Sequence, residues 1–227
     1  MKRSSVLLIL TISTLFSFQT MQTKKKILFF GDSITQAGVS PEGYISRMDS
    51  ILKSKGQDRN YELLGAGIGG NKVYDLYLRM EEDVLSKKPD AVVIWIGVND
   101  VWHKRTSGTG TDADKFEKFY SAIIKKLKDQ KITVYLCTPA AIGEKHDATN
   151  SLDGDLNLYS VLIRKIAAAN ECGLVDLRQA FLDHLKANNG ENKDRGILTT
   201  DGVHLNRTGN IFVAQRMYEA LYPNFIK

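Results

Sequence analysis

Residues 27–33 read Ile-Leu-Phe-Phe-Gly-Asp-Ser, a short apolar run that is ended by a glycine and followed by a small hydroxyl residue. The apolar run predicts a buried strand, and Gly31 marks the point where that strand ends. A helix that begins directly afterwards would present Ser33 at the carboxyl edge of a sheet, where many active sites lie. Ser33 is therefore a candidate nucleophile if other segments supply a base, a group that orients this base, and oxyanion donors.

Four more apolar segments follow this strand, and helix-like patterns separate them. In order, strands are expected at 26–30, 61–64, 91–96, 132–137 and 174–177. Apolar residues at helical spacing predict helices between these strands, and a last helix at about residues 207–221. Strands that alternate with helices indicate a parallel α/β sheet. Two connections are polar, one around Gly108 and Gly110 and one at 138–154, and loops as long as the second are often functional.

The first 23 residues differ in character from the rest of the chain. Lys2 and Arg3 precede an apolar run at 6–18, and polar residues follow this run. This order is typical of a secretory signal peptide, and the apolar run is short for a membrane span. We therefore expect a signal peptide at 1–23, one domain at 24–227, and a secreted or periplasmic protein without stable membrane insertion. No Ala-x-Ala pattern defines a cleavage site, so retention of the segment as an anchor stays open.

The net charge of the chain argues against one class of partner, nucleic acid. The 227 residues include 31 Lys and Arg against 26 Asp and Glu, a formal charge of +5, part of which lies in the signal segment. An excess this small and scattered does not indicate a nucleic-acid binder.

The two cysteines are expected at different ends of the sheet. Cys137 is expected near the carboxyl end of one strand and Cys172 before the amino end of the next, too far apart for a disulfide. We expect two free, partly buried thiols, although export would permit a disulfide.

The loops after the first three strands contain residues suited to acyl transfer. They carry Ser33, Gly70 and Asn99, and parallel strands bring such loops to one edge of the sheet. The backbone amides of Ser33 and Gly70 and the side-chain amide of Asn99 are expected to form an oxyanion hole. Asp201 precedes His204 by three residues and is expected to orient its ring, so that His204 can act as the base for Ser33.

The other three histidines fit this role less well. His184 is expected on the surface, and His146 lies in the polar loop, where rigid placement is difficult. His103 lies beside the third loop and is expected to line a substrate pocket. His204 is the one with a carboxylate placed to fix its tautomer.

Each site residue also has a purely structural interpretation. Ser33 would cap a helix, a role that Asp32 or Thr35 could share. Asn99 would close a turn. Asp201 would cap a short turn, and His204 would be an ordinary surface histidine. Taken singly these alternatives stay open, but their joint placement at one sheet edge favours the catalytic interpretation.

A second motif competes with the oxyanion interpretation. Gly65-x-Gly67-x-x-Gly70 matches the dinucleotide-binding fingerprint. The match follows the second strand rather than the first, and no acidic residue ends a strand about 20 residues later. The fingerprint is therefore a weak signal.

At these residues the chain resembles the SGNH hydrolases, the GDSL esterase/lipase family, over nearly everything after the signal segment. Four blocks carry the resemblance in family order: Gly31-Asp32-Ser33-Ile34, Gly67-Ile68-Gly69-Gly70-Asn71, Gly97-Val98-Asn99-Asp100 and Asp201-Gly202-Val203-His204. Ile34 replaces the usual Leu, and Gly65 stands where many members carry Asn. The resemblance implies a three-layer, flavodoxin-like fold and ester hydrolysis through an acyl-enzyme, without metal or cofactor. It assigns the same five site residues to the same roles.

The expected substrate is a short-chain ester, an acetyl ester on a carbohydrate, because the loops are polar and no apolar lid is evident. A lysophospholipase or thioesterase is the second interpretation, and it would need an apolar acyl channel. A non-catalytic carbohydrate-binding relative is the third, but none of the five site residues is missing.

Overall fold

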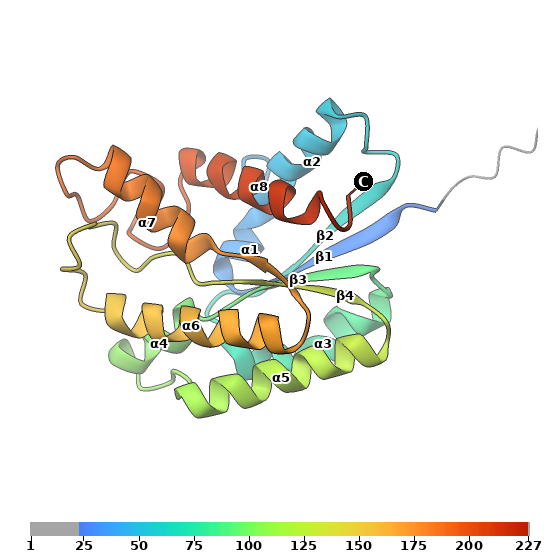
Figure 1. Cartoon of the computed structure of the whole chain (residues 1–227), viewed down its shortest axis with the longest axis horizontal. Coiled ribbons are helices and arrows are strands. Elements are labelled where there is room, and N and C mark those ends of the chain that lie inside the picture. Colours follow the sequence, from blue (N-terminus) through green and yellow to red (C-terminus); the bar gives the residue numbers. More distant parts are fainter. Residues whose placement is uncertain (1–22, 227) are drawn as a thin grey trace, which may run out of the picture.

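The computed structural model describes residues 23–226, in which five parallel strands form one sheet in the order β2-β1-β3-β4-β5 (Figure 1). This strand order is that of flavodoxin-like folds, so the predicted α/β class with a five-stranded parallel sheet is confirmed. The strands are β1 (Lys25–Gly31), β2 (Tyr61–Gly67), β3 (Ala91–Trp95), β4 (Thr133–Cys137) and β5 (Gly173–Val175).

Helices cover both faces of the sheet and complete three layers (Figure 1). α2 (Tyr44–Ser54), α7 (Leu177–Asn188) and α8 (Arg207–Leu221) pack on one face, and α3 (Val73–Asp83), α5 (Ala113–Asp129) and α6 (Asp153–Ala169) pack on the other. The short helices α1 (Ser33–Gly38) and α4 (Val98–Thr106) begin where β1 and β3 end, and a 3₁₀ turn, η1 (Leu85–Lys87), follows α3.

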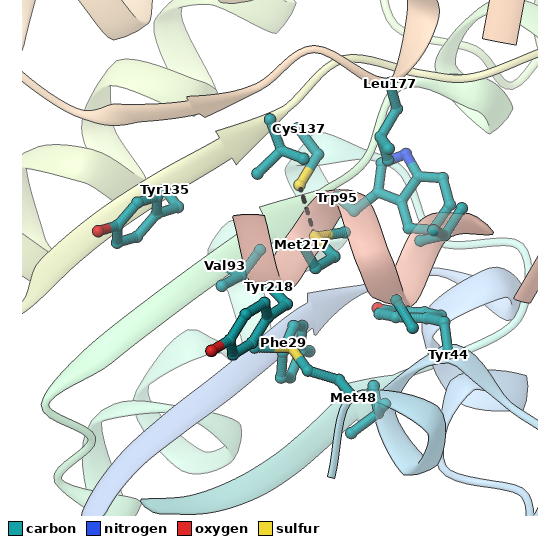
Figure 2. Packing of buried hydrophobic residues seen from close by; sticks show 14 of the residues in the cluster. Phe29, Tyr44, Met48, Val93, Trp95, Tyr135, Cys137, Leu177, Met217 and Tyr218 are labelled. Carbon is teal, nitrogen blue, oxygen red and sulfur yellow. Dashed lines mark hydrogen bonds between the residues drawn. The ribbon is translucent and has the colours of Figure 1, made fainter. Parts of the chain in front are cut away.

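Alternate strand residues point to opposite faces, and both faces are buried. Phe29, Trp95 and Cys137 face α2 and α8, as Figure 2 shows, while Leu28 and Ile94 face α3 and α5. Burial on both sides explains why the strands are continuous apolar runs rather than alternating ones.

The register of the strands aligns their carboxyl ends. Gly31 of β1 lies opposite Gly67 of β2 and opposite Trp95 of β3. The segments that follow these three residues therefore start at one level, and they carry Ser33, Gly70 and Asn99.

The structure differs from the sequence prediction in two details. Residues 98–106 form the helix α4, which was not predicted, because only Val98, Val101 and Trp102 of them are apolar and no helical stripe is visible. Leu177 belongs to α7 rather than to the fifth strand, because the side chain of Asp176 caps that helix by accepting a hydrogen bond from the amide of Gln179.

Both cysteines are free, as predicted. Cys137 is fully buried, and its Sγ lies 3.8 Å from Sδ of Met217 (Figure 2). Burial raises the pKa of the Cys137 thiol, which makes it unreactive. Cys172 is half-buried before β5.

The predicted signal segment, 1–23, lies almost wholly outside the described residues, so it and the domain boundary stay predictions. Within residues 23–226, none of the helices has both the length and the apolar character needed to cross a membrane.

Candidate active site

Ser33 is the first residue of α1, and the preceding residue caps this helix. The carboxylate of Asp32 accepts a hydrogen bond from the amide of Ile34 at 2.9 Å, so Ser33 is not needed as the cap. Its Oγ lies 2.9 Å from Nε2 of His204, a residue 171 positions further along the chain. A hydroxyl in contact with an imidazole is the pair that nucleophilic catalysis requires.

Asp201 lies on the other side of the His204 ring. Its Oδ2 is 2.7 Å from Nδ1 of His204, and its Oδ1 accepts hydrogen bonds from the amides of Val203 and His204. Partial burial alone would raise the pKa of Asp201, but these hydrogen bonds together hold it below its ordinary value. A carboxylate that stays ionised favours the His204 tautomer with its proton on Nδ1, which leaves Nε2 free to accept from Ser33.

The turn that carries Asp201 and His204 is anchored by a buried carboxylate from the loop after β4. Glu144 is fully buried and accepts hydrogen bonds from three successive amides, those of residues 197–199, at 2.6–2.7 Å. Next to it, the amide of Gly143 donates to the carbonyl of Gly202 at 2.9 Å. Gly202 has a φ of 96°, which a side chain would strain. The loop after β4 therefore helps to fix the position of His204.

Gly70 and Asn99 follow β2 and β3, the two neighbours of the strand that leads to Ser33. Gly70 has a φ of 76°, and among the described residues no acceptor takes the amide hydrogens of Gly70 or Ser33. Asn99, 4% exposed, donates one hydrogen of its amide to the carbonyl of Asn71 at 3.1 Å. A side-chain amide has two hydrogens, so the second is available to a substrate oxygen.

Arg79 joins the segments that carry this side of the site, and the sequence analysis did not single it out. Its guanidinium donates to the carbonyls of Gly31 and Ala66 at 2.8 and 3.0 Å, and to the side chain of Asn71 at 2.7 Å. It also lies over the ring of Phe30, 4.5 Å from the ring centre. The side chain of Arg79 thus connects the ends of β1 and β2 with Asn71, whose carbonyl accepts from the Asn99 amide. A sequence signal was absent, because Arg79 looks like an exposed mid-helix residue.

Lys72 is a second residue that the sequence analysis missed. It is 8% exposed, and its Nζ donates to the carbonyl of Gly70 at 2.8 Å and lies 3.5 Å from the carboxylate of Asp75. Its charge and the burial of His103 both lower the pKa of His103, burial having the larger effect. The ring of His103 lies next to Gly70, and its lowered pKa favours the neutral form.

Two buried carboxyl groups lie behind the crevice. Burial raises the pKa of Asp32 to about 6 and that of Asp100 to about 7. Hydrogen bonds that the carboxylates accept, Asp32 from the amide of Ile34 and Asp100 from the amide of Val73, partly offset this effect.

The remaining predicted candidates lie elsewhere. His184 packs on Phe212, 4.9 Å between ring centres, and the exposed His146 lies in the loop after β4. Gly65 and Gly67 are explained by close packing, since a Cβ at Gly67 would lie 2.1 Å from the amide nitrogen of Gln36. Gly65 and Gly67 are thus needed because β2 packs closely against α1 and the residue after it, and this packing explains them without any role in binding a dinucleotide.

A family model described as the GDSL-like Lipase/Acylhydrolase family matches residues 29–210. The chain belongs to this family. The predicted resemblance is therefore confirmed, and this GDSL hydrolase is a serine hydrolase that acts on ester bonds.

Several of the similar proteins are named as acetylxylan esterases. An acetylxylan esterase from Geobacillus stearothermophilus is 30% identical over 207 residues, which cover 84% of this chain and 91% of the relative. Among solved structures, the acetyl xylan esterase AlAXEase is 66% identical with a TM-score of 0.85, covering 86% of this chain and 99% of its own. An acetylxylan esterase structure from Geobacillus stearothermophilus has a TM-score of 0.78 at 26% identity, covering 91% and 98% of the two chains.

Proposed function

We propose that this GDSL hydrolase removes acetyl groups from a carbohydrate through an acyl-enzyme, with Ser33, His204 and Asp201 as the catalytic triad. The observation that carries the proposal is the contact of 2.9 Å between Ser33 Oγ and His204 Nε2, with Asp201 bound to the far nitrogen of the same ring. The similarity to acetylxylan esterases supports the acetyl and carbohydrate parts of the substrate.

In the first half of the proposed reaction, His204 takes the proton of Ser33 while Oγ attacks the acetyl carbonyl. The amides of Ser33 and Gly70 and the side chain of Asn99 donate hydrogen bonds to the resulting oxyanion. Collapse of this intermediate breaks the bond to the sugar oxygen, which receives the proton from His204. The acetyl group is then bound to Ser33.

In the second half, water replaces the sugar. His204 accepts a proton from this water while the water oxygen attacks the acetyl carbonyl, and a second oxyanion forms. Collapse of this intermediate breaks the bond to Ser33, whose Oγ receives the proton from His204, and acetic acid leaves and ionises in water. Asp201 stays ionised in both halves and stabilises the charged ring of His204, in keeping with its lowered pKa.

Secretion belongs to the proposal as well. The basic, apolar and polar order of residues 1–23 supports export. An exported enzyme would meet polymeric carbohydrate outside the cell. Peptide sequencing of the mature N-terminus would test whether residues 1–23 are removed.

The test of the proposed function is a substrate panel for the full chain. We expect acetate release from acetylated xylan, and a kcat/KM that falls steeply from acetyl to octanoyl esters of p-nitrophenol. A profile that rises with chain length, together with hydrolysis of lysophosphatidylcholine, would contradict the proposal and favour the lysophospholipase or thioesterase interpretation. Absence of any hydrolysis would leave the carbohydrate-binding interpretation.

A further inference from the structure

A hollow of about 450 Å³ lies between α4 and the loop after β4. This volume is within the range of roughly 300–1,000 Å³ that small-molecule sites occupy. Six residues line it: Trp102, Arg105, Thr106, Ile142, Ser151 and Leu152.

Both walls of the hollow are next in sequence to residues that contact the site. On the α4 side, Trp102 lies one helical turn beyond Asn99, and the next residue, His103, lies against Gly70. On the loop side, Ile142 precedes Gly143, whose amide is bonded to the turn that carries His204. A substrate bound at Ser33 thus has the hollow as its neighbour.

The side chains of the hollow combine an aromatic surface with hydrogen-bond donors. Trp102 is half-buried, and within residues 23–226 its indole N–H has no acceptor. The guanidinium of Arg105 forms no ion pair with a described residue, and Ser151 contributes a hydroxyl group. The hydroxyl of Thr106 donates to the carbonyl of Trp102 at 3.2 Å, so it offers a sugar only an acceptor. A sugar ring has an apolar C–H face and a rim of hydroxyls, and this mixture suits it better than it suits an acyl tail.

Buried contacts support both walls of the hollow. Trp102 packs against the apolar clusters on both faces of the sheet. The loop is held by Arg178, 2% exposed, which donates to the carbonyl of Ala140 at 3.1 Å and to the carboxylate of Asp153 at 2.6 Å. A site formed in advance loses little entropy when a ligand binds.

We propose that this hollow is a subsite for the sugar unit next to the acetylated one, with Trp102 as the stacking surface. The proposal rests on the proposed function and deepens it, because it makes an acetylated oligosaccharide the preferred substrate over a single acetylated sugar. Arg105 and Ser151 donate hydrogen bonds to the hydroxyls of this second sugar.

The test compares two substrates in the same protein preparation. For each variant, kcat/KM is measured on acetylated xylotriose and on p-nitrophenyl acetate, and the ratio of the two is reported. Loss of folded protein lowers both values equally and leaves the ratio unchanged, so a destabilised variant is still informative.

We expect Trp102→Ala to lower this ratio at least about fivefold, the size of a significant contact residue, and Trp102→Phe to restore most of it. Ser151→Trp, which fills the hollow without altering α4, should lower the ratio as well. Tyr222→Ala removes an aromatic ring that is 48% exposed just after α8 and does not line the hollow, and it serves as the control with a wild-type ratio.

An unchanged ratio in both Trp102→Ala and Ser151→Trp would overturn the subsite while leaving the proposed function intact. A larger loss on octanoyl than on acetyl esters in these variants would show that the hollow takes an acyl tail, which also overturns it. Failure of the wild-type protein to hydrolyse any acetylated saccharide would instead contradict the proposed function itself.

Discussion

The two sides of the crevice are built in different ways. On the acid–base side, the side chains of His204 and Asp201 are 40% and 46% exposed, and they lie on the turn that precedes α8. On the oxyanion side, Asn99 and Lys72 are buried, and Arg79 joins the strand ends behind them.

This difference matches what each side has to do in the proposed reaction. The base must meet a water molecule in the second half, so exposure is useful there. The oxyanion donors must already point at the developing charge, because donors that reorient during the reaction stabilise it less. The difference can be tested one side at a time.

The largest effect is expected from the nucleophile. Ser33→Ala should lower the hydrolysis of p-nitrophenyl acetate by roughly 10⁴–10⁶-fold, and His204→Ala nearly as much, because the residues of a triad act as one unit. Steady-state kinetics measures the loss, and thermal unfolding should show an intact fold. Ser50→Ala, an exposed serine on α2, is the matched control. A Ser33→Ala protein that keeps its full rate would refute the triad.

On the oxyanion side, Asn99→Ala should lower kcat by roughly 10²–10³-fold with little change in KM, because its amide is proposed to bond only to the charged intermediate. Single-turnover measurements on p-nitrophenyl acetate separate the two constants. If the change lies in KM alone, Asn99 binds substrate and is not an oxyanion donor.

A smaller loss is expected when the support behind the oxyanion donors is weakened. Arg79→Lys keeps the charge but lacks the planar fork that reaches the carbonyls of Gly31 and Ala66. We expect kcat to fall about ten- to a hundredfold while KM stays within about twofold, since small misplacements of reacting groups are costly. Asp83→Asn removes only the ion pair of Arg79 and is the control. An Arg79→Lys protein that loses stability but keeps kcat would make Arg79 purely structural.

The smallest effect on rate is expected at Asp100, where the change appears in stability. Burial raises its pKa to about 7 in the folded protein from 3.8, with Asp32 adding to the rise and Lys72 opposing it. The folded state therefore keeps a proton that the unfolded state releases, and the free energy of unfolding falls as pH rises from about 4 to 7.

Asp100→Asn cannot titrate, although its oxygen can still accept from the amide of Val73. Urea unfolding at pH 5, 6, 7 and 8 should show the variant gaining stability relative to the wild type as pH rises. A constant difference across these pH values would contradict the raised pKa.

The residues that sequence reasoning identified share one property: each follows a predicted strand or precedes a predicted helix. Ser33, Gly70 and Asn99 could be located because the carboxyl ends of parallel strands meet at one edge. Arg79 could not, since its partners Gly31 and Ala66 come from two other elements, and nothing local distinguishes it from a solvent-exposed arginine. The helix α4 was missed for a similar reason, because its first turn is fixed by burial of Val98 and Val101 rather than by a long apolar stripe.

Glu144 has a consequence for how substrate preference can change in this family member. Its carboxylate is the acceptor for three amides of residues 197–199, so the loop after β4 and the segment before Asp201 form one structural unit. A loop transplanted from a relative without its matching segment would leave these buried amides without an acceptor, at about 1–3 kcal/mol each. Chimeras should therefore exchange residues 138–152 and 189–204 together, and evolution faces the same coupling when it reshapes this rim of the crevice.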